Sequence, residues 1–172
     1  MTLGPETLRE HRRGEVFVET GTYHGDGIRA ALDAGFQTVY SIELNEELYK
    51  RAVEEFRDDP RVHLVHGDSA LELGSIVATL EGAEATLWLD AHASGPLRYD
   101  GGTPIVHEIR AIAKSGCKAT ILIDDCRLMG SAEWGYVTKN EILRALDDLP
   151  YAFEVSYTDG YQKDDIMVVT PV

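Results

Sequence analysis

Acidic side chains follow five short apolar runs along this chain of 172 residues. They are Glu19, Glu43, Asp68, Asp90 and the adjacent pair Asp124 and Asp125. An acidic residue at such a place can simply cap the following helix, and this alternative stays open for Asp68. Runs of this kind predict strands, and in an open α/β sheet the ligand binds beyond the carboxyl ends of the strands. We therefore expect these residues to converge at one edge of a sheet and to bind a ligand there.

Three of these carboxylates have the chemistry of a metal site. Asp90, Asp124 and Asp125 would lie at the tips of neighbouring strands, where their charges repel one another unless a cation or protons neutralise them. Sites with only oxygen ligands favour hard cations, so Mg²⁺ is the expected ion, with Mn²⁺ or Ca²⁺ as alternatives. A different interpretation is that the second aspartate of the pair only caps a turn.

His92 stands two residues after Asp90 and is the candidate general base. Its unperturbed imidazole titrates near neutral pH, so it could remove the proton from a substrate hydroxyl. Asp90 would be the second catalytic residue, because the reaction would depend on the cation that Asp90 binds. Equally, His92 can serve only as a hydrogen-bond donor to Asp90.

The segment ETGTYHGDG, residues 19–27, is a glycine-rich turn behind the first apolar run. Its glycines Gly21, Gly25 and Gly27 do not have the GxGxxG spacing that suits a pyrophosphate. Glu43 ends the next apolar run, 22 residues after Gly21, where a carboxylate can accept two hydrogen bonds from ribose hydroxyls. The turn and Glu43 together indicate a nucleotide-type cofactor.

The elements that would position these residues alternate along the chain. Short runs rich in β-branched or aromatic residues predict buried strands at 16–19, 38–43, 62–68, 85–90 and 119–125. Helical patterns lie between them, with expected N-terminal signals at Asp26, Asn45, a Ser69–Glu72 capping box and Thr103 before Pro104. Strands separated by helices of this length indicate parallel βαβ units with right-handed crossovers.

The alternation ends after the fifth strand. Thr138 is expected to open a last helix, and residues 151–157 and 165–172 to pair as an antiparallel hairpin around a turn at Asp159–Gly160. The sequence therefore predicts an α/β fold with a Rossmann-like, doubly wound sheet of five parallel strands followed by a C-terminal hairpin. We see no repeat or linker, so residues 1–172 are expected to form a single domain.

Three of these motifs resemble those of the class I methyltransferases that use S-adenosylmethionine. ETGTYHGDG resembles the first cofactor motif of that family, SIELNEE (41–47) the acidic second and HGDSA (66–70) the third. The resemblance covers nearly the whole chain, since the family's sheet has five parallel strands, a sixth, and an antiparallel seventh from a C-terminal hairpin. The first motif departs from the usual GxGxG core, because Thr20, Thr22 and Tyr23 make this turn bulkier.

This resemblance implies a cofactor site. The turn would cradle the methionine moiety, Glu43 would hold the ribose and Asp68 would approach the adenine amine. The cofactor-binding residues that it implies are Glu19, Gly21, Thr22, Tyr23, Gly25, Glu43, Asp68, Ser69 and Asp90.

The segments LWLDAHASG (87–95) and ILIDDCRL (121–128) are similar to those of metal-dependent O-methyltransferases of the catechol and macrocin types. In those families an Asp after the fourth strand and an Asp–Asp or Asp–Asn pair after the fifth bind the metal, and the matching residues are Asp90, Asp124 and Asp125. The catechol-type enzymes use a lysine close to the position of His92, so the resemblance does not identify the base. It implies metal-assisted O-methylation of a small hydroxylated metabolite such as a sugar or phenol. The alternative is a protein of the same fold that binds S-adenosylmethionine without methyl transfer, or with another metal-assisted reaction.

The composition of the chain limits the classes of molecule that it is expected to bind. The 30 acidic and 16 basic residues give a net charge of −14, which argues against binding to nucleic acid or anionic membranes. We see no signal peptide and no apolar stretch near the length of a membrane span, so a cytoplasmic protein is expected. Cys117 and Cys126 form no CxxC motif and require no disulfide.

Two polar loops, 93–103 and 127–137, are expected to shape the substrate pocket. Arg98 and Arg127 can pair with an anionic substrate group, or they can balance the aspartates. A pocket built from so few parts is open or is completed by a second subunit. The expected partners are therefore a small-molecule acceptor and a second copy of the chain.

Overall fold

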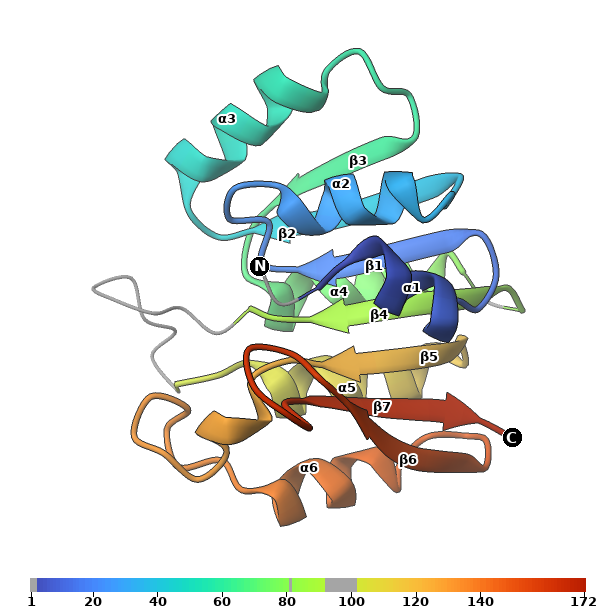
Figure 1. Cartoon of the computed structure of the whole chain (residues 1–172), viewed down its shortest axis with the longest axis vertical. Coiled ribbons are helices and arrows are strands. Elements are labelled where there is room, and N and C mark those ends of the chain that lie inside the picture. The colour runs from blue at the N-terminus through green and yellow to red at the C-terminus, as the bar shows by residue number, and fades with distance from the viewer. Residues whose placement is uncertain (1–2, 81, 92–101) are drawn as a thin grey trace.

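Seven strands form one sheet in the computed structural model of this chain, which describes residues 3–80, 82–91 and 102–172. From edge to edge their order is β3-β2-β1-β4-β5-β7-β6. Their bounds are β1 Val16–Thr20, β2 Thr38–Glu43, β3 Val62–His66, β4 Glu84–Leu89, β5 Lys118–Ile123, β6 Phe153–Thr158 and β7 Ile166–Pro171. Strands β1 to β5 are parallel, and β7 runs antiparallel to β5 and β6 (Figure 1). The predicted sheet, with five parallel strands and a C-terminal hairpin, is confirmed.

Helices cover both faces of this sheet. Their bounds are α1 Pro5–His11, α2 Asp26–Asp33, α3 Glu46–Phe56, α4 Ser69–Ala78, α5 Ile105–Ser115 and α6 Lys139–Leu146. Apolar residues of α1 and α2 pack in one core cluster, against which Phe56 of α3 also lies. Those of α4, α5 and α6 pack in a second cluster. Figure 1 shows α1 and α2 in front of the sheet and α4 and α5 behind it, so the sheet is the middle of three layers.

Neighbouring residues of a central strand fill opposite cores. Phe17 packs in the cluster of α1 and α2, while Val18 packs in the cluster of α4, α5 and α6. In β5, Leu122 and Ile121 divide in the same way, and all four side chains are fully buried. A strand covered on both faces must be apolar on both, which explains why the strand segments are nearly continuous apolar runs.

The chain changes direction across the sheet between β1 and β4. It runs outward from β1 through β2 to β3, then returns to β4 beside β1 and continues to β5. Thr20 at the end of β1 is paired with Leu89 at the end of β4, so the loops after the two strands begin side by side. Ligands of open α/β sheets bind at such a switch point. The ends of β1 and β4 are therefore the expected centre of a site.

The helix starts agree with the sequence only in part. Asn45 caps α3 and Thr138 opens α6 with a capping box, as predicted. For α2 the predicted cap is wrong, because Asp26 is the first helical residue and Gly25 is the cap. The backbone of Gly25 lies in the left-handed region, with φ of 77°, a conformation that favours glycine.

The ends of the chain also differ from expectation. Residues 159–165 connect β6 to β7, in place of a tight turn at Asp159–Gly160, and the side chain of Asp159 accepts a hydrogen bond from the N–H of Asp164 inside this loop. Helix α1 is not predicted by the sequence, and Leu3 and Leu8 bury this N-terminal segment in the core beside α2. In the described ranges, no helix has the length and apolar character needed to cross a membrane.

Candidate functional site

The glycine-rich turn after β1 lies directly on the end of β4. The N–H groups of Gly21 and Thr22 donate to the carbonyl of Ile42, at 2.9 and 3.3 Å, which folds the turn over the end of β2. Gly21 has a φ of +90°, and a Cβ at this position would lie 2.5 Å from the carbonyl oxygen of Asp90. Only glycine fits here, so the turn and the end of β4 are in contact.

Glu43 fastens this turn to the end of β2. Its Oε2 accepts the N–H of Tyr23 at 2.8 Å, and its Oε1 accepts the N–H of Asn45 at 2.8 Å. The residue is 7% exposed. Tyr23 has a φ of 48°, and its side chain is exposed. The predicted ribose-binding residue therefore also determines the shape of the turn.

Glu19 supports the turn from below. Ser41 donates its hydroxyl to Glu19 Oε1 at 2.6 Å, so the 2.5 Å bond between Thr22 and Ser41 has Thr22 as its donor. Helix α2 packs against the other oxygen of Glu19, because a Cβ on Gly27 would lie 1.9 Å from Glu19 Oε2. Burial raises the pKa of Glu19 to about 8, against the lowering effect of the bond from Ser41. Glu19 and Thr22 are thus buried parts of the turn's support, and their contact with a cofactor stays a prediction.

Asp68 caps helix α4, as the alternative interpretation had it. Its Oδ1 accepts the N–H of Ala70 at 2.9 Å. The predicted Ser69–Glu72 capping box is therefore wrong, because the cap lies one residue earlier. Ser69 is the first helical residue and is buried. A role for Asp68 beside an adenine stays a prediction.

Asp90, Asp124 and Asp125 come together as predicted. Each offers a carboxylate oxygen, and these oxygens all lie within 4.8 Å of one another. Asp124 and Asp125 are buried, and Asp90 is partly exposed. The geometry brings three hard oxygen donors to the ends of β4 and β5, which is a donor set that a divalent cation can use. Whether a cation binds there stays a prediction.

Arg127 lies beside this acidic cluster. Its Nη1 donates to carboxylate oxygens of both Asp125 and Asp165, and its backbone N–H donates to Asp165 Oδ1 at 2.9 Å. The interpretation that Arg127 balances the aspartates is therefore confirmed. Asp165, which is 1% exposed, is not predicted by the sequence, where it looked like the polar start of the last strand.

Glu108 is a second acidic residue that the sequence reasoning missed. It lies on α5 and is 1% exposed, and its Oε1 is buried without a hydrogen-bond partner among the described residues. Burial raises its pKa to about 7, and the charges of Asp68 and Asp90 act in the same direction. A signal was present, because Glu108 falls on the inward helical stripe with Ile105, Ile109 and Ile112.

The candidate base His92 lies outside the described residues, as do Arg98 and most of the loop 93–103. In the second predicted pocket loop, Trp134 is buried and Tyr136 is exposed. The second loop contacts the chain at Gly102, where the described residues resume, because a Cβ on Gly102 would lie 2.2 Å from the backbone nitrogen of Gly135.

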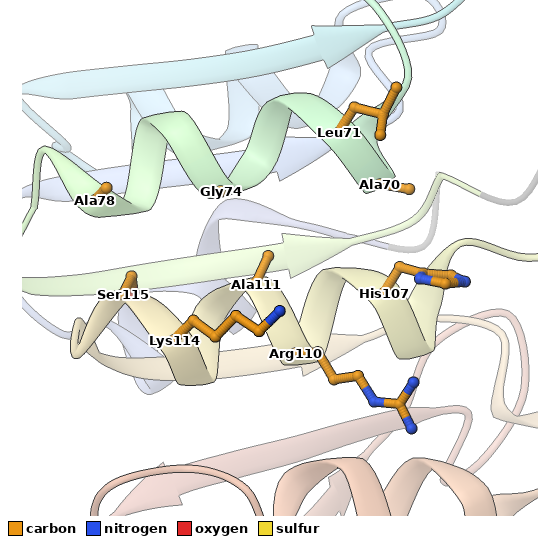
Figure 2. A pocket seen from close by; sticks show the side chains of 9 residues that line it. All are labelled: Ala70, Leu71, Gly74, Ala78, His107, Arg110, Ala111, Lys114 and Ser115. Atoms are coloured by element: carbon orange, nitrogen blue, oxygen red, sulfur yellow. The ribbon is translucent and has the colours of Figure 1, made fainter.

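A shallow groove of about 470 Å³ lies elsewhere, between α4 and α5. Figure 2 shows Leu71 and small residues along α4, and three basic side chains on α5, which are His107, Arg110 and Lys114. Among the described residues, no carboxylate lines this groove. It therefore has a basic lining, in contrast to the acidic strand ends.

The chain was compared with known proteins. No protein-family model matches it, and no curated protein sequence matches it. Solved structures share its fold, and these structural neighbours are S-adenosylmethionine-dependent methyltransferases and related proteins, with O-methyltransferases among them.

Three of these structures illustrate the sequence identity, TM-score and coverage of the matches. A Clostridium thermocellum protein named as an rRNA methylase has 12% identity and a TM-score of 0.67, with 98% of this chain and 95% of that chain covered. Fibrillarin from Aeropyrum pernix, with natively bound S-adenosyl-L-methionine, has 18% identity and a TM-score of 0.57, with 91% and 66% covered. Spermidine synthase from Thermotoga maritima has 11% identity and a TM-score of 0.54, with 94% and 53% covered. This chain thus spans less than two thirds of the last two proteins, and at these identities the likeness concerns the fold alone.

Proposed function

We propose that this protein is an S-adenosylmethionine-dependent methyltransferase that acts on a hydroxyl of a small metabolite, a sugar or a phenol, with a divalent cation in the acidic cluster. One observation carries the proposal. The backbone of Gly21 in the glycine-rich turn lies against the carbonyl of Asp90. A ligand on the turn and a ligand on the acidic cluster would therefore be neighbours. The fold shared with S-adenosylmethionine-dependent methyltransferases supports the same function.

The residues around the turn fit this cofactor. Each oxygen of Glu43 accepts one backbone N–H, and a carboxylate oxygen has a further lone pair for a ribose hydroxyl. The surrounding carboxylates favour a sulfonium charge. Leu44 and Leu71 follow the ends of β2 and β3 and are 50% and 74% exposed, so they offer apolar surface for a base near Asp68.

The acidic cluster fits a hard cation. Asp90, Asp124 and Asp125 supply only oxygen donors, and Arg127 holds Asp125 in place. A cation bound there would make a substrate hydroxyl easier to deprotonate. We assign the removal of the hydroxyl proton to His92 from the sequence alone. The remaining task of the chain is to align the acceptor oxygen with the methyl group, which is catalysis by positioning.

Calorimetric titration tests the cofactor part of the proposal. The protein should bind both S-adenosylmethionine and S-adenosylhomocysteine, in the presence and in the absence of Mg²⁺. Absence of binding by the correctly folded wild type would contradict the methyltransferase function.

Methyl transfer to a panel of sugars, phenols and hydroxy acids tests the chemistry. Asp90→Ala should lose nearly all transfer of labelled methyl and still bind the cofactor, because the turn and Glu43 are untouched. His92→Ala should lose roughly 10²- to 10⁴-fold if it is the general base. Asp33→Ala, an exposed aspartate of α2, is the control. If a chelator leaves the rate of methyl transfer unchanged, the metal-assisted mechanism is refuted, while the methyltransferase function stands.

One observation favours a second candidate. Arg127 already pairs with Asp125, so part of the cluster's charge is balanced without a metal. This suits a protein that binds S-adenosylmethionine without metal-assisted methyl transfer. Cofactor binding without methylated product and without any response to divalent cations would select it.

A further inference from the structure

Arg29, on helix α2, connects three segments on the outer side of the glycine-rich turn. Its Nη2 donates to the backbone carbonyl of His24 at 2.9 Å, and its Nη1 donates to Asp26 Oδ1 at 2.7 Å. Its Nε and Nη2 both donate to Glu55 Oε1, at 3.0 and 2.5 Å. Glu55 lies near the end of α3, so one guanidinium ties the turn and the start of α2 to a different helix.

The end of α3 also packs directly on the turn. A Cβ on Gly25 would lie 2.7 Å from Cε2 of the Phe56 ring, and Phe56 is the last residue of α3. The guanidinium of Arg29 lies over the same ring, with its Cζ 5.7 Å from the ring centroid. The turn, α2 and α3 therefore meet at Arg29.

The two halves of the turn are attached to different elements. The inner half, residues 21–23, is bonded to β2 through the carbonyl of Ile42 and the carboxylate of Glu43. The outer half, residues 24–25, receives the bond from Arg29 and the ring contact from α3. Arg29 thus supplies on the outside the kind of attachment that Glu43 supplies on the inside.

The exposure of this network shows where its effect should appear. The side chains of Arg29 and Glu55 are 43% and 45% exposed, and an isolated ion pair at such a place contributes little to the free energy of unfolding. Each of the three guanidinium nitrogens of Arg29 has an acceptor, which fixes the plane of the group. Its main effect is therefore expected on the shape of the turn and not on the stability of the whole domain.

We propose that Arg29 is a positioning residue of the candidate cofactor site. It fixes the carbonyl of His24 from outside and couples the turn to α3. Helix α3 begins at Glu46, shortly after Glu43, so the bond from Arg29 to Glu55 links the two segments that would hold the methionine moiety and the ribose. The cofactor in this inference rests on the proposed function, whereas the hydrogen bonds do not.

Affinity for S-adenosylhomocysteine tests the effect on the site. Arg29→Ala should weaken binding about 3- to 30-fold, because the turn loses the charged donor on its outer side. Arg57→Ala is the matched control, since it breaks the adjacent exposed ion pair with Glu54 at the end of α3. It should keep the wild-type affinity, and both variants should melt close to the wild type. Wild-type affinity in Arg29→Ala would overturn the proposal.

A double-mutant cycle tests the coupling to α3. Glu55→Ala should weaken binding less than Arg29→Ala does, because Arg29 keeps its bonds to Asp26 and His24. In the Arg29→Ala background, Glu55→Ala should have no further effect, since Glu55 acts through Arg29. Additive losses in the double variant would overturn the coupling.

Amide hydrogen exchange gives a readout that needs no cofactor. The N–H groups of Tyr23 and Gly25 are bonded to Glu43 and to the carbonyl of Thr22. In Arg29→Ala these two amides should exchange faster, while those of α4 should not change. Unchanged exchange at Tyr23 and Gly25 would overturn the proposal. A wild type that does not bind S-adenosylhomocysteine would refute the proposed function, and the exchange comparison would still decide the role of Arg29.

Discussion

The acidic residues at the ends of β1, β2 and β3 and those beyond the ends of β4 and β5 lie at the same edge of the sheet, yet their surroundings differ. Glu19 and Glu43 accept hydrogen bonds from Ser41 and from backbone N–H groups. Asp68 accepts a backbone N–H at the start of α4. By contrast, the oxygens of Asp90, Asp124 and Asp125 gather within 4.8 Å of one another. The first group, the turn-side carboxylates, is held by hydrogen bonds within the protein, and the second, the acidic cluster, is the proposed cation site.

The largest expected effect concerns the pH dependence of the turn side. Glu19 has a pKa of about 8 in the folded protein and an ordinary value of 4.5 when exposed. The folded state therefore binds a proton that the unfolded state has released, so the free energy of unfolding falls as pH rises between these two values. The limiting slope is about 1.4 kcal/mol per pH unit, or about 4 kcal/mol from about pH 5 to about pH 8.

Glu19→Gln removes this titration while its amide oxygen still accepts the Ser41 hydroxyl. Its free energy of unfolding, measured by urea denaturation at several pH values, should fall less steeply and exceed that of the wild type at about pH 8. A smaller slope should remain below about pH 7 from Glu108, whose pKa is also raised. Parallel curves for variant and wild type would show that Glu19 is charged in the folded protein.

Glu43→Ala should have the next largest effect. It leaves the N–H groups of Tyr23 and Asn45 without their acceptor, so the free energy of unfolding should fall by about 3 kcal/mol. Affinity for S-adenosylhomocysteine should also fall, by roughly ten- to a hundredfold. Glu47→Ala, at an exposed position of α3, is the control. Unchanged affinity in a folded Glu43→Ala protein would remove Glu43 from the cofactor site.

The acidic cluster should respond to divalent cations. Mg²⁺ or Mn²⁺ at a hundred times its dissociation constant should stabilise the wild type by about 2.7 kcal/mol, seen as a higher melting temperature. Asp124→Asn/Asp125→Asn should abolish this shift, whereas the exposed adjacent pair Asp147→Asn/Asp148→Asn should keep it. A shift of equal size in all three proteins would place the cation elsewhere.

The smallest effect is expected at Asp68. Asp68→Ala removes the cap of α4 and should lower the free energy of unfolding by about 1 kcal/mol, whereas Asp68→Asn retains a good cap. Both can be measured by urea denaturation. If Asp68→Asn keeps the stability and loses cofactor affinity, the residue belongs to the cofactor site as well. If it keeps both, Asp68 is a structural cap only.

The sequence predicts the sheet and the meeting of Asp90, Asp124 and Asp125 because both follow from local patterns. Apolar runs locate the strands, and parallel strands bring their carboxyl ends to one edge. The partners of each carboxylate depend on residues far apart in the chain. Ser41 reaches Glu19 from β2, and Asp165 reaches Arg127 from the start of β7. Such contacts leave no mark on local spacing.

The close approach of Gly21 to the carbonyl of Asp90 has a consequence for how this protein can vary. Any side chain at position 21 would enter the space of the β4 backbone, in a conformation that disfavours it. A saturation library should therefore accept only glycine at position 21. Position 23, whose side chain is 65% exposed and whose φ is 48°, should accept glycine, asparagine and other residues that tolerate a left-handed backbone, and should disfavour β-branched residues. The turn can thus vary at its exposed position 23 within the limits of that backbone, and it is invariant where it touches β4, so changes on the outside leave the contact between the two loops intact.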